Sequence, residues 1–314
     1  MNGLASNDAG PFCVRTDAAL GSGVIPAFVN PAAGSADEVD KALRKAGCFD
    51  VREIAPDKVT QTVRAAIDGG ATRVAVAGGD GTVSAAAAAV ARTTAELVVI
   101  PAGTFNHFAR DHGIPTDLDA ACAAATSPRI ECADVAWVNG RLFLNTSAVG
   151  AYANFVRVRE RLEPKCGYWL ASAYSMVRTL VRMQPFRIRF ETDGVERTYE
   201  TPIVFLGVGQ RELKLPLLGN RIPDGRSRLH VMIVRGRTRA RLVALAFEAA
   251  ARGTHAMSRT PHLDSFLVER CTIEQRHSTV AVDGEVVKMD SPLEYELGAA
   301  SLRLVVPEAT ESEG

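Results

Sequence analysis

The stretch that decides the fold is Val74-Ala75-Val76-Ala77-Gly78-Gly79-Asp80-Gly81-Thr82-Val83, a short apolar run that passes directly into a glycine-rich segment. The apolar run predicts a buried strand, and the alanine-rich residues 84–92 predict a helix. Glycine lets a backbone approach a ligand closely, and the amides at a helix N-terminus favour anions. We therefore predict a phosphate-binding loop with one carboxylate, that of Asp80, built into it.

Two further loops repeat this pattern of an apolar strand that ends in small and polar residues. Residues 24–29 lead into Asn-Pro-Ala-Ala-Gly-Ser at 30–35, and residues 97–100 lead into Pro-Ala-Gly-Thr-Phe-Asn at 101–106. Helical patterns lie between the strands, as in βαβ units around a parallel sheet. Loops at the carboxyl ends of such strands line one crevice, so the three loops are expected to converge on one site.

The pattern changes to strands and tight turns after residue 130. An Asn139-Gly140 turn predicts a hairpin over 136–144, and Asp193-Gly194 and Asp283-Gly284 are further turn dipeptides. Strand-like runs follow at 186–192, 198–207, 228–234, 265–275, 279–282 and 301–306, with helical patterns at 168–184 and 240–253. This half of the chain predicts a β-sandwich.

The predicted fold class is therefore α/β plus all-β. We expect a Rossmann-like three-layer α/β nucleotide-binding domain over 24–135 and a β-sandwich domain over 136–306. Residues 1–23 are expected to be a flexible tail without signal-peptide character, and 307–314 a disordered acidic tail. No apolar run approaches the length of a membrane span, and the six cysteines form no Cys-x-x-Cys pair. These features predict a cytoplasmic protein with reduced thiols.

The chain carries 36 Lys and Arg against 36 Asp and Glu, but its middle is basic. Residues 151–241 hold 18 Lys and Arg against 8 Asp and Glu. This excess indicates either a solvated face or attraction to an anionic membrane. In the helix at 168–184, one face is expected to carry Trp169, Ala173, Met176, Val177 and Leu180, with Arg178 and Arg182 opposite. That helix packs against the sandwich or lies on a membrane surface. Nucleic-acid binding is not expected, because no such motif is present and aromatics are 6%.

Other phosphate-binding patterns are absent: the sequence contains neither Gly-x4-Gly-Lys-Ser/Thr nor a strict Gly-x-Gly-x-x-Gly, and it lacks the protein-kinase signatures. Instead, Gly-Gly-Asp-Gly-Thr at 78–82 resembles the signature shared by diacylglycerol kinases, sphingosine kinases and NAD kinases. The segments around it resemble the lipid-kinase branch: Asn-Pro at 30–31 with Gly34, the run 101–110, Asp134 with 139–150, Asp-Gly at 224–225, and Asp-Gly-Glu at 283–285. Six motifs in order over 30–285 are a specific match to the diacylglycerol kinase catalytic-domain family.

This resemblance implies a nucleotide-binding domain, a lipid-binding β-sandwich domain and an active site between them. It implies transfer of the γ-phosphate of ATP, with Mg2+, to a lipid hydroxyl, most simply diacylglycerol to phosphatidic acid in phospholipid biosynthesis. Independently of the resemblance, the basic region 157–189 predicts peripheral contact with an anionic membrane, and the formation of a homodimer stays open.

The same resemblance assigns site residues. The nucleotide would be held by Asn30, Gly78, Gly79, Asp80, Gly81, Thr82, Gly103, Thr104 and Asn106. The metal would be held by Asp80, Asp134 and Asp224. Glu285 would be the general base on the lipid hydroxyl and Asp80 would act at the phosphates and metal.

Each assignment has a structural alternative. Asp80 could cap a turn, Asp134 could be a strand-edge residue, and Asp283-Gly284 could be only a hairpin turn, which would leave Glu285 an ordinary surface residue. Asp224 could shape its turn or bind a structural ion. Asn106 could cap the helix that follows it.

One position departs from the family pattern. His107 stands where the family has an Asp, which puts the metal arrangement in doubt. Two other functions therefore stay open: phosphorylation of a soluble acceptor, as in NAD kinases, and a non-catalytic nucleotide or lipid sensor.

Overall fold

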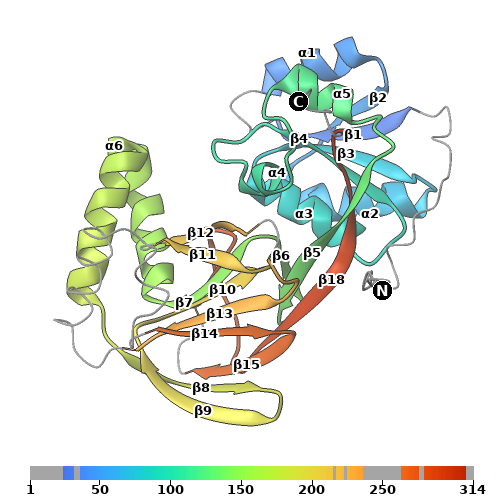
Figure 1. Ribbon diagram of the computed structural model, residues 1–314. Helices are drawn as coiled ribbons and strands as arrows, with labels where there is room; N and C mark the ends of the chain where they lie inside the picture. Colours follow the sequence, from blue (N-terminus) through green and yellow to red (C-terminus); the bar gives the residue numbers. More distant parts are fainter. Residues whose placement is uncertain are drawn as a thin grey trace, which may run out of the picture. The chain divides into compact units, whose positions relative to one another are not determined.

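The computed structural model describes residues 24–31, 36–214, 217–222, 225–235, 263–275 and 279–308 (Figure 1). The chain divides into two compact units. Unit 1 runs to Val135 and takes up the chain again from Gly298, and unit 2 is Ala136–Leu297. The predicted tail at 1–23, the helical pattern at 240–253 and residues 309–314 lie outside the described residues.

Unit 1 is built on a parallel sheet with the order β2-β1-β3-β4. Its strands are β1 (Ile25–Val29), β2 (Phe49–Glu53), β3 (Arg73–Gly78) and β4 (Glu96–Pro101). The chain leaves β1 toward β2 on one side and then builds β3 and β4 on the other. The direction of winding therefore reverses between β1 and β3, and such a switch point is where ligands bind in open α/β sheets.

Helices cover both faces of this sheet, as predicted (Figure 1). One face packs on α1 (Ala36–Ala46) and α5 (Leu118–Ala124) through a shared apolar core. The opposite side carries η1 (Pro56–Lys58), α2 (Val59–Asp68) and α3 (Asp80–Val90), followed along the chain by α4 (His107–Asp111). Helix α3 begins at Asp80, four residues before the predicted 84–92, because the glycine motif itself forms the first helical turn.

Unit 2 contains two sheets packed face to face. One has the order β14-β13-β10-β7-β16-β17, and the other contains β5, β6, β18, β15, β8 and β9. Their bounds are β5 Ile130–Val138, β6 Arg141–Phe143, β7 Thr146–Gly150, β8 Phe186–Thr192, β9 Val195–Thr201, β10 Ile203–Val208, β13 Leu229–Val234, β14 Leu263–Val268, β15 Arg270–Gln275, β16 Thr279–Val282, β17 Glu285–Lys288 and β18 Leu293–Val305. A separate ribbon pairs β11 (Arg211–Lys214) with β12 (Leu217–Arg221).

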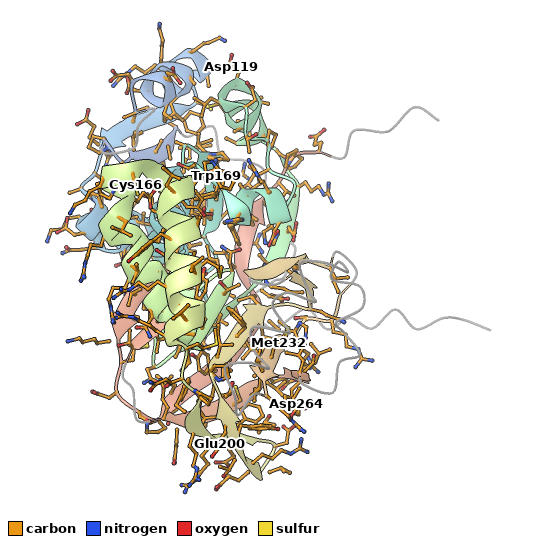
Figure 2. All side chains as sticks on the ribbon, turned by 90° about the vertical axis from the view of Figure 1, so that its left-hand side faces the viewer. Asp119, Cys166, Trp169, Glu200, Met232 and Asp264 are labelled. Atoms are coloured by element: carbon orange, nitrogen blue, oxygen red, sulfur yellow. The ribbon has the colours of Figure 1, made fainter. Side chains whose placement is uncertain are left out.

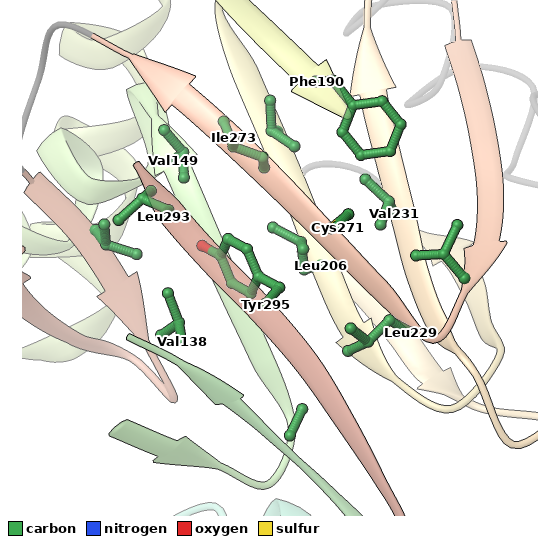
Figure 3. Close-up of a cluster of buried hydrophobic side chains, with 14 of the residues drawn as sticks. Val138, Val149, Phe190, Leu206, Leu229, Val231, Cys271, Ile273, Leu293 and Tyr295 are labelled. Atoms are coloured by element: carbon green, nitrogen blue, oxygen red, sulfur yellow. The ribbon is translucent and has the colours of Figure 1, made fainter. Parts of the chain in front are cut away.

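Alternating side chains show that the first of these sheets is buried on both faces. Val149, Leu206 and Val231 point into the core between the sheets, next to Tyr295 of β18 (Figure 3). Their neighbours in sequence belong to a second core on the other face: Ala148, Phe205 and Met232. This is the period-two alternation of β-strands, and it confirms the predicted sandwich.

The second core is covered by α6 (Ala151–Arg182). This helix is interrupted at Gly167, where φ is 75° and ψ is 165°, so it consists of two helical halves. Of the predicted helix face, Ala173 is exposed, and Trp169 and Val177 are largely exposed rather than packed against the sandwich. Met176 of the same predicted face packs against the second core, so the segment meets the sandwich through part of this face while Trp169 and Val177 stay exposed.

Several boundaries differ from the sequence-based expectation. The run 198–207 is two strands that meet at Pro202, and 265–275 is two strands that meet at Glu269. Strand β18 pairs with β15 near Leu293 and with β4 near Leu304, so its second half belongs to unit 1 rather than to a domain that ends at 306. Cys132 is disulfide-bonded, which contradicts the expectation of uniformly reduced thiols. No helix among the described residues is long and apolar enough to span a bilayer.

Candidate active site

The three predicted loops of unit 1 meet at the carboxyl ends of β1, β3 and β4. The Asn30 side-chain amide donates to Thr82 Oγ1 at 3.3 Å, which joins the first loop to the second. The Ala102 amide donates to the Gly78 carbonyl at 3.0 Å, which joins the third loop to the second. The structure therefore brings the loops together at the switch point of the sheet, as the pattern of strands predicts.

The second and third loops touch through backbone alone. A Cβ built on Gly103 would stand 2.5 Å from the Gly79 Cα, and one built on Gly78 would stand 2.6 Å from the Thr82 Cβ. Real side chains do not fit at such distances, so glycine is required at 78 and 103 for steric reasons. The close approach leaves bare backbone facing the crevice, as binding of a phosphate requires.

Asp80 is the first residue of α3, and Gly79 is its N-cap with no side-chain cap bond. The amides of Asp80, Gly81 and Thr82 have no acceptor within the helix, because the first turn of any helix leaves its amides unpaired. These amides and the helix dipole favour an anion. The Asp80 carboxylate accepts from the Phe108 amide at 3.4 Å, so it bridges α3 and α4.

Asn106 closes the third loop on itself. Its side chain accepts from the Gly103 amide at 3.0 Å and donates to the Gly103 carbonyl at 2.8 Å, with φ at 51°. It is the N-cap residue of α4 by position but makes no side-chain cap bond, so the capping alternative is wrong. Thr104, beside it, is exposed.

The fit of a divalent cation rests on Asp80. Within the described residues no group of three or more His, Cys, Asp and Glu could hold an ion. Mg2+ in phosphoryl-transfer sites is held by one or two carboxylates together with substrate phosphates, so a single loop carboxylate fits that chemistry.

The other two predicted metal ligands, Asp134 and Asp224, are not part of the glycine loops. Asp134 is 5% exposed, and its Oδ1 accepts from the Ala300 amide at 2.9 Å. Ala300 has φ of 49° within β18, so Asp134 supports an irregular point of that strand. Asp224 lies outside the described residues. His107 is exposed, and its ring stacks on Phe105 with centroids 5.5 Å apart.

Glu285 and its turn lie in unit 2. The Asp283 carboxylate accepts from three amides: Leu144 at 2.8 Å, Asn145 at 2.9 Å and Thr146 at 3.0 Å. Asp283 therefore ties the turn to the start of β7. Glu285, two residues later, is exposed and pairs with Arg141 at 2.6 Å. Asp283 and Gly284 therefore form the hairpin turn that the structural alternative predicted. Glu285 follows this turn directly, so the turn also positions Glu285.

Sequence reasoning missed the partners of these carboxylates. Arg141 beside Glu285 carries no local signal, because the two residues are 144 positions apart. The Phe108 amide beside Asp80 is likewise invisible in the sequence. Unit 2 contains an arginine-lined cavity, and its signal in the sequence is the four-residue spacing of Arg157 and Arg161 and of Arg178 and Arg182. That spacing alone indicates only a basic surface.

The part of the chain that contains these loops is similar to known proteins. Residues 25–138 match the model of the diacylglycerol kinase catalytic domain. The matched range contains all three loops of the site and Asp134.

Curated relatives are similar to a part of this chain. A protein of Cronobacter sakazakii (strain ATCC BAA-894) named "Probable lipid kinase YegS-like" is 31% identical over 154 residues, which are 47% of this chain and 50% of that protein. A protein of the same name from Pseudomonas aeruginosa (strain UCBPP-PA14) is 40% identical over 90 residues, which are 28% of this chain and 30% of that protein. The chain thus spans half or less of the length of these curated relatives.

A similarity in fold to solved structures covers most of the chain. A crystal structure described as a diacylglycerol kinase from Bacillus anthracis strain Sterne has a TM-score of 0.70 at 22% identity. The match covers 91% of this chain and 98% of that one. It confirms the fold class, an α/β domain joined to a β-rich domain.

Proposed function

We propose that this protein is an ATP-dependent lipid kinase that transfers the γ-phosphate of ATP to the free hydroxyl of diacylglycerol and yields phosphatidic acid. The observation that carries the proposal is the convergence of three glycine-containing loops at the switch point of a diacylglycerol kinase catalytic domain. The names of the curated relatives and of the similar crystal structure support a lipid acceptor.

In this proposal the loops position the phosphates and stabilise their charge. Phosphoryl transfer needs positioning and charge neutralisation more than covalent chemistry from the protein. The amides of Asp80, Gly81 and Thr82 would donate to phosphate oxygens, and the bare backbone of Gly79 and Gly103 would let them approach. Mg2+, when bound, supplies further neutralisation of phosphate charge, and Asp80 would hold it.

The acceptor hydroxyl must lose its proton as the new bond to phosphorus forms. Glu285 is our candidate for the base, because its carboxylate is held by a turn and by Arg141 rather than left mobile. A carboxylate within hydrogen-bond reach of the hydroxyl can take that proton late in the reaction.

The experiment is transfer from radiolabelled ATP in mixed micelles that contain diacylglycerol, ceramide or sphingosine, with NAD as a soluble acceptor. The proposal predicts label in phosphatidic acid that depends on Mg2+. Label in NADP alone would support the soluble-acceptor alternative. Nucleotide binding without transfer to any acceptor would support the sensor alternative.

A further inference from the structure

The two halves of α6 form a helical hairpin in unit 2. The chain reverses at Gly167, and the halves, 151–166 and 168–182, lie side by side with Cys166 and Trp169 near the tip (Figures 1 and 2). The Arg159 guanidinium lies 5.6 Å from the centre of the Tyr168 ring, which links the halves near that tip. The hairpin is therefore a folded element and not one long kinked helix.

The first half of the hairpin packs on the sandwich with several apolar side chains, and the second half adds Met176 to the same core. Phe155 and Val156 are buried in the core that also contains Phe205 and Met232. Tyr152 stacks on Phe155 with ring centroids 5.8 Å apart. The second half is held through its small residues, since Ala171 and Ser175 are fully buried.

The outer face of the second half is apolar and exposed. Eight large hydrophobic side chains are exposed among the described residues, and five of them lie in this one segment. They are Trp169, Leu170, Tyr174, Val177 and Val181. Their spacing of three and four places them along one side of the helix, and Trp169 is 83% exposed. Single exposed hydrophobic residues need no explanation, but a continuous stripe along a helix marks an interaction surface.

A cavity of about 670 Å³ lies between the two halves, toward the base of the hairpin. Four arginines line it: Arg157 and Arg161 from the first half, and Arg178 and Arg182 from the second. None of the four has an ion pair with a carboxylate in the part of the chain that the structure describes. Arg157 makes only long hydrogen bonds, at 3.4 Å, to Asn154 and Thr279. No acidic partner among the described residues pairs with these four guanidinium groups, so the cavity favours an anion that can accept charge-assisted hydrogen bonds from them.

The cationic cavity and the apolar outer face are neighbours on one helix. Arg178 and Arg182 continue the four-residue row that begins with Leu170 and Tyr174, so the row changes from apolar to cationic along its length. Residues 164–190 contain five Lys and Arg and no Asp or Glu. An apolar stripe flanked by arginine is the pattern of helices that lie in the interface of anionic bilayers.

We propose that the outer face of the hairpin lies in the surface of an anionic lipid bilayer and that the arginine-lined cavity holds the phosphate of an anionic phospholipid from that bilayer. A phospholipid matches both features at once, because its phosphate meets the arginines while its acyl chains stay beside the apolar stripe. An uncharged lipid such as diacylglycerol has no group for these arginines. The bound lipid is therefore a docking ligand and not the acceptor of the phosphoryl group. This inference does not rest on catalysis.

The test is sedimentation of the full chain, without nucleotide, with vesicles of phosphatidylcholine alone or with about one third phosphatidylglycerol. The protein is expected to bind the anionic vesicles preferentially. Replacing both Arg178→Ala and Arg182→Ala should weaken that binding on the order of 30-fold, the effect of two arginines at a membrane surface. The matched control is Arg187→Ala with Arg189→Ala, which removes the same charge from arginines already paired with Glu200, Glu196 and Glu274. The control pair is expected to bind nearly as the unchanged protein does.

A second pair of changes tests the apolar face. Leu170→Ser with Val177→Ser should weaken vesicle binding at least tenfold and leave the melting temperature unchanged, because both side chains are exposed. A lower melting temperature with unchanged vesicle binding would mean that another part of the chain covers this face, and it would overturn the proposal.

Two further outcomes would also overturn it. Equal losses in the arginine pair and its control would indicate diffuse charge rather than a cavity. Calorimetry that finds inorganic phosphate alone bound as tightly as the vesicles would indicate a site for a free anion. If the double alanine variant fails to fold by circular dichroism, Arg178→Lys with Arg182→Lys keeps the charge but loses the planar fork, and it should still bind more weakly than the unchanged protein.

Discussion

The guanidinium of Arg141 on β6 lies 2.6 Å from the carboxylate of Glu285 on β17. Both side chains are exposed, and exposed ion pairs contribute only about 0–1 kcal/mol to stability. The pair therefore contributes more to the orientation of the Glu285 carboxylate than to the stability of the protein. A candidate general base held in this way can be tested without disturbing the fold.

Glu285→Gln is expected to lower kcat for lipid phosphorylation by about 10²- to 10⁴-fold, the usual range for loss of a general base. The melting temperature should stay within error, because the side chain is exposed. The control is Glu196→Gln, which removes the same charge from an exposed pair with Arg189 in the same unit. Equal activity in the two variants would remove Glu285 from the mechanism.

Asp283 is expected to be structural. Its Oδ2 accepts from the Leu144 amide and its Oδ1 accepts from the amides of Asn145 and Thr146. Asp283→Asn places an NH2 group against one of these donors, and we expect a loss of about 1.5–3 kcal/mol of unfolding free energy in urea.

Asp193→Asn is the matched control for that change. Asp193 also has a positive φ, 51°, and precedes a glycine. Unlike Asp283, its carboxylate accepts no backbone amide among the described residues. Asn is favoured in such turns, so the control should be neutral within about 0.5 kcal/mol. Equal stability of the two variants would contradict the structural role of Asp283.

The contact between the glycine loops predicts that alanine destabilises the protein more at position 103 than at position 79. A Cβ on Gly103 would stand 2.5 Å from the Gly79 Cα, whereas a Cβ on Gly79 would stand 3.4 Å from the Gly103 Cα. Gly103→Ala should therefore cost about 1–3 kcal/mol of stability and weaken ATP binding, because the loops must separate. Gly79→Ala should be milder in stability. Thermal unfolding and calorimetry with ATP measure both, and a reversed order would show that the loops are not in contact.

His230 on β13 predicts a pH dependence of stability. Burial lowers its pKa below the ordinary value of 6.5. Its Nδ1 accepts from the Arg211 amide at 3.1 Å, so the folded protein holds the ring neutral. Below pH 6.5 the unfolded chain therefore binds a proton that the folded one does not, and the free energy of unfolding falls as pH falls through this window.

Urea unfolding at several pH values from 7.5 to 5 measures this slope. We expect His230→Gln to be less stable at pH 7.5 but to lose less stability on acidification. His107→Gln, at an exposed histidine, should keep the slope of the unchanged protein. An unchanged slope in His230→Gln would show that other groups cause the acid destabilisation.

The parts of the fold that follow from local sequence were predicted from it. Each glycine loop follows its strand directly, so the site of unit 1 could be predicted once three strands were known to be parallel. The Asn139-Gly140 hairpin is equally local, because both residues have positive φ, as a two-residue turn requires.

The parts that depend on distant partners could not be predicted. Helical periodicity groups Trp169 with Val177 but does not say whether their face is covered, and it is exposed. The Asp134 carboxylate accepts from the Ala300 amide, 166 residues away, and the local sequence carries no sign of that contact. Strand β18 looked like the end of a sandwich, yet its second half, from Gly298, belongs to unit 1 and pairs there with β4.

The most direct test of the central claim compares Asp80→Asn with Asp117→Asn in the phosphorylation of diacylglycerol. Both carboxylates accept a backbone amide near the start of a helix, from Phe108 and from Ala120 respectively, but only Asp80 lies in the glycine loop. We predict that the unchanged protein forms phosphatidic acid, that Asp80→Asn lowers this rate by at least about 100-fold, as expected for a lost charge-stabilising group, and that Asp117→Asn retains it. Phosphatidic acid formed equally by Asp80→Asn and the unchanged protein would contradict the account.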